Sequence, residues 1–170
     1  ILVSVLAFMR FGILGKQIAN VIRMLFGDSY LFASGLLALF GLVNLIYNQP
    51  IHLTVKRFIG LSLTFIGVLL LQSNLYFEHE LVNSGFLNSF WHAMSAEFGR
   101  AGVTESVGGG FVGALGYQIF YPLLGQIGIN VFAVLLLPIG VLMFFDVKFR
   151  TIIEKFQSIS QLFIQRNKEA

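Results

Sequence analysis

The sequence predicts an all-α integral membrane protein: a bundle of about four transmembrane helices with an additional short glycine-rich helix and an interfacial amphipathic helix. Hydrophobic residues make up 56% of the chain and charged residues 11%, whereas a soluble domain carries about 25% charged residues. The mean hydropathy is +0.83. Charged residues are absent from three long stretches, between Asp28 and Lys56, Arg57 and Glu78, and Glu105 and Asp146. Such gaps can hold the ~20 residues of a membrane-crossing helix.

The chain opens within an apolar run without an initiator Met, so we interpret residues 1–11 as the surviving part of a first span. Residues 16–26 then form a short amphipathic stretch. In it, Lys16, Asn20 and Arg23 recur at helical spacing on one face. This pattern favours a helix that lies in the headgroup layer with those side chains on its polar face.

Two further spans are predicted over residues 30–47 and 58–75, both apolar on all sides. Each carries a row of small residues that would let a neighbouring helix approach closely. The rows are Ser34, Gly35, Ala38 and Gly41 in the first, and Gly60, Thr64 and Gly67 in the second. Because the loop between the spans is short, we expect them to be antiparallel neighbours.

Residues 76–106 form the most polar segment, and we interpret them as an extracytoplasmic loop with some helical pattern. The forty uncharged residues 106–145 are about twice the length that one helix needs. Glycines and a proline near the middle of this stretch indicate a break. We therefore predict a short glycine-rich helix over 110–121 and a fourth span over 129–145, which complete a transmembrane anchor domain over residues 1–145. Residues 146–170 are expected to form an amphipathic connector helix in the cytoplasm.

The basic residues indicate an orientation. Lys56 and Arg57 before the third span, and five residues after the fourth, including Lys148 and Arg150, would lie on one side, against four on the other. Basic loops tend to stay in the cytoplasm. The count therefore favours a multi-pass protein of the inner-membrane type with both termini in the cytoplasm. Lys56, Arg57, Lys148 and Arg150 are the residues predicted to set this topology.

Two local patterns resemble ligand-binding motifs but lack the residues that the chemistry needs. Gly108, Gly110 and Gly113 match GxGxxG and the glycine spacing of a P-loop, yet no Lys with Ser or Thr follows them, and no acidic residue stands about twenty positions on. His79 opens an HExxH-like pattern whose second histidine position holds Asn83. We therefore predict no catalytic, cofactor-binding or metal-binding residue.

Close helix packing and assembly is the role predicted for the glycine-rich segment. Its residues are Gly108, Gly109, Gly110, Gly113 and Gly116. Within the spans, the polar residues are amides and hydroxyls, whereas ion-coupled transport usually needs ionisable groups at depth. A small transporter or channel subunit is therefore kept only as the alternative function.

The order of elements and one local stretch resemble the membrane-embedded N-terminal domain of the FtsK/SpoIIIE family of DNA translocases. The stretch is the glycine triplet of 107–115, which opens a short helix, followed by Gly125-Gln126-Ile127-Gly128 and the hydrophobic run to Phe145. The resemblance implies a four-span anchor that holds a translocase at the division septum, self-associates, and acts in chromosome segregation and cell division.

The resemblance also implies what this stretch does not do. ATP, Mg and DNA would be handled by a motor domain outside these residues, so the chain itself is expected to bind no cofactor and to be no enzyme. Its expected partners are the lipid bilayer, further copies of itself and division-septum proteins. Residues 91–105 are expected to make contacts outside the membrane.

Overall fold

The computed structural model describes residues 1–47, 54–79 and 85–147. These residues form α-helices and one 3-10 turn, and no strand occurs among them. The elements are α1 (Leu2–Met9), α2 (Gly12–Phe26), η1 (Gly27–Ser29), α3 (Tyr30–Tyr47), α4 (Val55–His79), α5 (Phe86–Arg100) and α6 (Gly110–Phe144). Three helical stretches are long and apolar enough to cross a membrane: Gly12–Tyr47, Val55–Phe77 and Gly110–Phe144. The predicted all-α membrane fold is confirmed.

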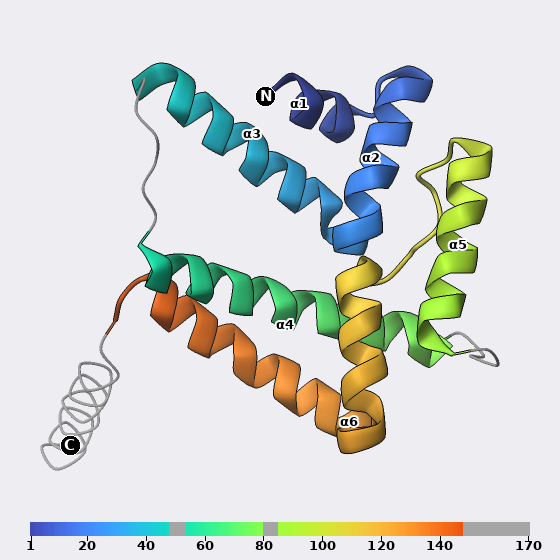
Figure 1. The fold of residues 1–170 in the computed structure, drawn as a ribbon, viewed down its shortest axis with the longest axis vertical. Helices are drawn as coiled ribbons and strands as arrows, with labels where there is room; N and C mark the ends of the chain where they lie inside the picture. The colour runs from blue at the N-terminus through green and yellow to red at the C-terminus, as the bar shows by residue number, and fades with distance from the viewer. Residues whose placement is uncertain (48–53, 80–84, 148–170) are drawn as a thin grey trace, which may run out of the picture.

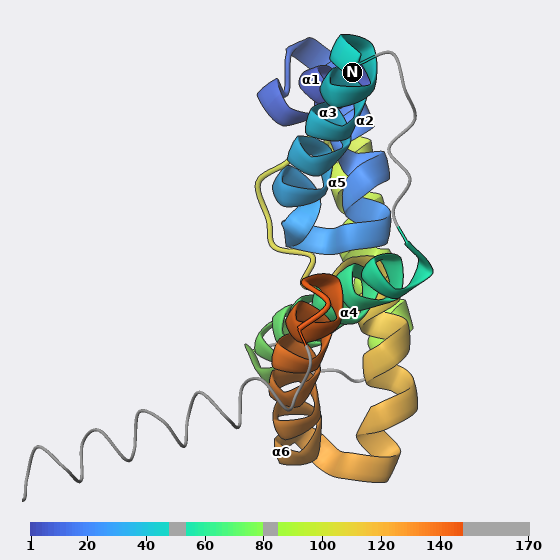
Figure 2. The same ribbon diagram turned by 90° about the vertical axis from the view of Figure 1, so that its left-hand side faces the viewer.

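The helices run in two directions (Figure 1). α3, α4 and the second half of α6 cross the long axis of the molecule, and we call them the crossing helices. α2, α5 and the first half of α6 run steeply to them, at the end where α3 begins and α4 finishes. We call these three the end layer. Seen after a quarter turn, the molecule is narrow (Figure 2).

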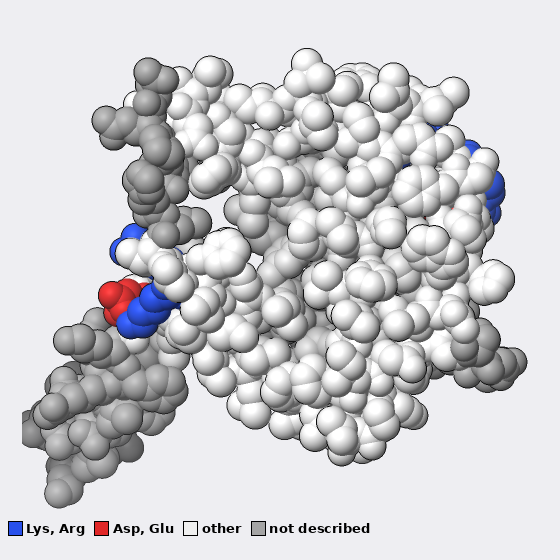
Figure 3. Space-filling view, viewed as in Figure 1, with Lys and Arg blue, Asp and Glu red and all other residues white. Residues whose placement is uncertain are grey.

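Charged side chains on the face shown in Figure 3 gather at two opposite edges of the molecule. The surface over the crossing helices between those edges is uncharged. Many large apolar side chains of the crossing helices are exposed, among them Phe40 on α3 and Val134 on α6. An uncharged apolar band between two charged edges is the distribution that a bilayer requires.

The closest packing between crossing helices joins α4 to the second half of α6. A Cβ on Gly60 would lie 2.7 Å from the carbonyl oxygen of Gly140, and a Cβ on Gly140 would lie 2.5 Å from the backbone nitrogen of Thr64. A Cβ on Gly67 would likewise lie 3.0 Å from the carbonyl oxygen of Ala133. The small-residue row predicted for the third span therefore faces α6, because only small residues let two helical backbones come this close.

The second and third spans run antiparallel, as expected, but their mutual contact is small (Figure 1). α3 packs mainly on α1 and α2, whereas α4 packs mainly on α6. The end of α2 also contacts α4: the rings of Phe26 and Phe65 meet edge to face at 5.2 Å. Phe32 of α3 reaches the same Phe65 ring at 6.1 Å. Around Gly35, expected to meet a neighbour, a Cβ would contact no atom of the described residues within 4 Å.

The helical pattern in the segment 76–106 corresponds to real helices. α4 extends into the segment, and α5 forms because Phe90, Met94 and Glu97 recur at helical spacing and are all buried. Earlier in the chain, the predicted first span 1–11 contains the eight-residue helix α1.

A break divides α6 where glycines and a proline predicted one. Gly125 has φ 65° and ψ 177°, which is a backbone conformation confined to glycine. The predicted helix 110–121 lies in the first half, in the end layer, and most of the predicted span 129–145 lies in the second half. Of the predicted connector 146–170, residues 148–170 lie outside the described part of the chain.

Candidate functional site

A buried ion pair joins two helices of the end layer. Arg23 on α2 is 2% exposed and Glu97 on α5 is 0% exposed. The guanidinium Nη1 of Arg23 donates to Oε2 of Glu97 at 2.9 Å. Two charges that leave water together need good geometry and further hydrogen bonds, since desolvation otherwise outweighs their attraction. Whether this pair is stable therefore depends on the other hydrogen bonds that each partner makes.

Glu97 accepts hydrogen bonds from three directions. The Thr104 backbone N–H donates to Oε2 at 2.9 Å, the Thr104 hydroxyl donates to Oε1 at 3.3 Å, and Arg100 Nη2 donates to Oε1 at 3.0 Å. Burial alone would raise the pKa of Glu97, but the Thr104 N–H, Arg23 and Arg100 together hold that pKa below its usual value. Glu97 is therefore a stable anion.

Arg23 reaches four further groups with the rest of its guanidinium. Nη1 also donates to Oδ1 of Asn20 at 3.3 Å, and Nη2 donates to the Glu105 carbonyl oxygen and lies 3.5 Å from Oδ1 of Asp28. The Tyr30 ring lies 5.6 Å from its central carbon. Within the described part of the chain, Nε has no hydrogen-bond partner. Arg23 thus fastens α2 to α5 and to the segment after α5.

Side chains of α2 also hold the carboxyl end of α5. Asn20, fully buried, donates through Nδ2 to the Gly102 carbonyl oxygen at 2.9 Å. Gln17 Nε2 donates to the Phe98 carbonyl oxygen at 3.1 Å. The last carbonyls of a helix lack partners within the helix, so α2 satisfies the end of α5.

A second contact, which we call the glycine junction, joins residues 27–28 to residues 107–110. The backbone N–H of Asp28 donates to the Gly108 carbonyl oxygen at 2.8 Å, and the Val107 N–H donates to Oδ1 of Asp28 at 3.2 Å. Gly27 and Gly110 both have positive φ. A Cβ on Gly27 would lie 1.9 Å from the Gly108 oxygen, so the two backbones can touch only where side chains are missing.

The first half of α6 then crosses α4 along its predicted glycine face. The Gly109 N–H donates to the Ser73 hydroxyl at 3.2 Å. A Cβ on Gly109 would lie 2.0 Å from the Leu69 carbonyl oxygen, and one on Gly113 would lie 2.7 Å from the same oxygen. A Cβ on Gly116 would lie 2.8 Å from Cδ2 of Leu70.

The glycine face is therefore occupied inside the chain. Gly108 lies against Tyr76 of α4, and Gly110 lies against the backbone of Gly27. α4 and η1 contact all five glycines within the chain. The sequence interpretation placed helix packing and assembly on these residues, and the structure shows the packing.

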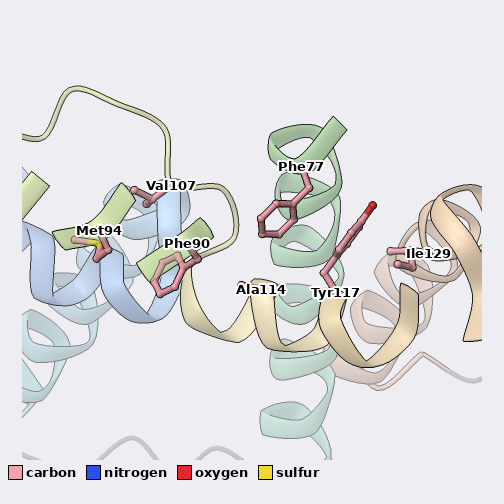
Figure 4. Close-up of a cluster of buried hydrophobic side chains, with 7 residues drawn as sticks. All are labelled: Phe77, Phe90, Met94, Val107, Ala114, Tyr117 and Ile129. Atoms are coloured by element: carbon pink, nitrogen blue, oxygen red, sulfur yellow. The ribbon is translucent and has the colours of Figure 1, made fainter. Parts of the chain in front are cut away.

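An apolar cluster lies between α4, α5, the segment before α6 and both halves of α6 (Figure 4). Figure 4 labels its members: Phe77, Phe90, Met94, Val107, Ala114, Tyr117 and Ile129. The Tyr117 hydroxyl donates to Oδ1 of Asn74 at 3.0 Å, so its polar end is satisfied. The cluster and the ion pair use successive turns of α5, which fixes that helix at two levels.

Two of the four residues predicted to set topology lie at the opposite end of the molecule. Lys56, at the start of α4, forms an exposed ion pair with Asp146, just after α6. Arg57 is exposed beside it. Lys148 and Arg150 lie outside the described residues. Within residues 1–47, 54–79 and 85–147, no three His, Asp or Glu side chains come together as metal ligands.

Sequence reasoning missed the ion pair. It assigned Asn20 and Arg23 to a face in the headgroup layer, but both are buried against α5, and only Lys16 of that trio is exposed. A signal was present: Glu97 follows Phe90 and Met94 at helical spacing, which places a carboxylate on the apolar face of α5. A carboxylate on an apolar face predicts a buried basic partner.

The descriptions of the family model and of the similar proteins that the chain matches agree with one another. The sequence model of a family described as the 4TM region of DNA translocase FtsK/SpoIIIE matches residues 9–157. The chain is 29% identical over 165 residues to a DNA translocase FtsK of Lactiplantibacillus plantarum, covering 97% of this chain and 20% of the relative. It is 27% identical over 172 residues to that of Listeria monocytogenes, covering 100% of this chain and 23% of the relative. No solved structure matches.

Proposed function

Because the chain belongs to the FtsK/SpoIIIE family of DNA translocases, as their 4TM region, we propose that it is the membrane anchor and assembly domain of a septal translocase. That parent protein would act in chromosome segregation and cell division. The chain spans about a fifth of the length of the curated relatives that it matches. ATP, Mg and DNA would accordingly be handled by a motor elsewhere in the parent, and this multi-pass membrane region would locate that motor.

One structural observation carries the anchoring role: uncharged crossing helices lie between two edges where charges gather (Figure 3). In our proposal, the edge with Lys56, Arg57 and Asp146 faces the cytoplasm of a bacterial inner membrane, and both termini lie on that side. The chain continues from Asp146 toward the proposed motor. The Lys56–Asp146 pair would tie the exit of the chain to α4.

Assembly would use surfaces other than the glycine face. Further copies of the chain and division-septum proteins are the proposed partners, with the end layer presented outside the cytoplasm. Its outermost helix, α5, carries exposed Trp91 and Ser95. The Arg23–Glu97 pair supports this role, since it holds α5 rigidly in place. No observation favours the alternative of a transporter or channel subunit.

The proposal is tested by imaging residues 1–170 fused to a fluorescent protein in dividing cells of a bacterium that carries an FtsK. A band at the septum is expected, and fluorescence should stay with the membrane after alkaline extraction. Uniform membrane fluorescence would overturn the septal role, and soluble fluorescence would overturn the anchor. Cross-linking of the same fusion in membranes tests assembly, and a purely monomeric product would contradict it.

A further inference from the structure

The turn between α1 and α2 exposes large apolar side chains at one end of the molecule. Phe11 is 61% exposed, Ile13 is 73% exposed and Leu14 is 74% exposed. α1 ends at Met9, and the next residue, Arg10, has φ 53°, which turns the chain sharply. We call residues 10–16 the α1–α2 corner. Three such side chains in water would be unfavourable, at ~25 cal/mol for each Å² left exposed.

Two cations flank these apolar side chains. Arg10 and Lys16 are both exposed, and among the described residues neither forms an ion pair with a carboxylate. Two other exposed cations have carboxylate partners: Arg100 pairs with Glu105, and Lys56 pairs with Asp146. The corner therefore carries an uncompensated positive charge beside apolar surface.

Arg10 is already oriented. Its guanidinium carbon lies 5.4 Å from the centre of the Tyr30 ring, a cation–π contact that fixes the side chain at the start of α3. Gly15 brings the first turn of α2 against α1: a Cβ there would lie 2.8 Å from the Leu6 carbonyl oxygen. The spacing between Arg10 and Lys16 is thus set by a rigid turn.

The corner lies at the level where the crossing helices meet the end layer (Figure 1). In a membrane this is the boundary between acyl chains and headgroups. Basic side chains beside exposed apolar ones at that boundary suit a phospholipid, since the acyl chains cover the apolar residues and the phosphate approaches the cations.

We infer that the α1–α2 corner binds anionic phospholipid, with Arg10 and Lys16 on the headgroup and Phe11, Ile13 and Leu14 among the acyl chains. The inference rests on the proposed membrane role and adds a lipid preference to it. Zwitterionic lipid would cover the apolar residues equally well but would leave the two positive charges uncompensated.

Fluorescence quenching by brominated lipids tests the inference directly. Trp91 is the single tryptophan of the chain, so Trp91→Phe with Phe11→Trp places one reporter in the corner. The full chain is reconstituted in phosphatidylcholine vesicles in which an equal fraction of either phosphatidylglycerol or phosphatidylcholine is brominated. We expect stronger quenching by the anionic lipid, with a preference of about fivefold for each basic residue.

Two variants of the reporter chain separate the site from a general charge effect. Arg10→Gln with Lys16→Gln should abolish the preference while quenching by brominated phosphatidylcholine persists. Arg57→Gln, which removes an exposed charge at the opposite end, should leave the preference unchanged.

Equal quenching by the two lipids, or a preference that survives the double substitution, would overturn the inference. Loss of all quenching in vesicles that still retain the chain would also overturn it, because the corner would then be covered by protein. Failure of the chain to float with vesicles would instead refute the membrane anchor itself, so the two failures are distinguishable.

Discussion

Arg23 and Glu97 form the buried ion pair that joins α2 to α5. Each is nearly inaccessible to water, and together they touch α2, α5 and the segment 104–105. Removing one member of a buried pair leaves the other charge uncompensated, which is more harmful than removing both. The pair therefore gives a sharp test at the scale of single residues.

Glu97→Gln should destabilise the domain by about 3 kcal/mol, because buried Arg23 would lose its hydrogen-bonded anion and, among the described residues, keep only the 3.5 Å ion-pair contact with Asp28. Thermal unfolding of the chain in detergent micelles, followed by circular dichroism, would show a lower Tm. Glu105→Gln is the matched control: its carboxylate is exposed and contacts only Arg100 through its side chain among the described residues. Equal melting of the Glu97 and Glu105 variants would contradict the role of the buried pair.

Acid should weaken the same contact. The folded-state pKa of Glu97 lies below the usual 4.5, since the Thr104 N–H and two arginines outweigh the effect of burial. A carboxyl group with a lowered folded pKa contributes its full stability above its unfolded pKa, and that contribution disappears as pH falls through the folded pKa. Stability should therefore decline below about pH 4.5.

The measurement is Tm as a function of pH for the wild-type chain and for Glu97→Gln. The variant should be less stable at neutral pH and should lose less stability on acidification. A parallel decline in both proteins would show that other carboxylates cause the acid sensitivity.

At the scale of elements, the sequence predicts the helices better than their contacts. The predicted span 30–47 coincides with α3, and the predicted start of the glycine-rich helix coincides with the start of α6 at Gly110. Both follow from local signals, namely an uncharged run of bilayer length and a glycine triplet. Gly125 is likewise visible as a break, because only glycine adopts its dihedral angles readily.

The contacts between elements are less visible in the sequence because apolar spans offer no strong pairing signal. α3 and α4 are antiparallel as expected and touch through Phe32 and Phe65, yet the main partner of α4 is α6, which the sequence did not indicate. The pairing of Asn20 and Arg23 with α5 depends on residues more than seventy positions away. The helical spacing of polar residues in the sequence indicates which face of α2 is polar. It does not indicate whether that face is buried against another helix.

The crossing of α6 over α4 should be intolerant of even one methyl group. Gly109→Ala would place its Cβ 2.0 Å from the Leu69 carbonyl oxygen, so the backbones must separate, at a cost of about 1–3 kcal/mol. Gly99→Ala is the matched control in α5, where a Cβ meets no described atom within 4 Å. That substitution should stabilise its helix by about 0.5–1 kcal/mol.

Thermal unfolding of both alanine variants in micelles measures the difference. A Gly109→Ala protein as stable as wild type would show that α6 and α4 are not in backbone contact. A strongly destabilised Gly99→Ala protein would show that α5 has another neighbour.

At the scale of the whole molecule, the crossing helices separate the end layer from the edge with Lys56 and Asp146. Because the chain contains no cysteine, single-cysteine variants report sidedness without background. Lys56→Cys and Ser95→Cys, both at exposed positions, should react with a membrane-impermeant maleimide from opposite sides of sealed vesicles. Labelling of both variants from one side would contradict the arrangement of the crossing helices relative to the bilayer.

The long separation between the ion-pair partners has a consequence for biosynthesis. Arg23 precedes Glu97 by 74 residues, so the ribosome delivers the cation well before its counter-charge, and α4 must enter the membrane in between. During that interval Arg23 has to remain hydrated, or be sheltered by the insertion machinery. Closure of the end layer is thus a late event in membrane insertion, and chains released before α5 emerges would be natural substrates for quality-control proteolysis.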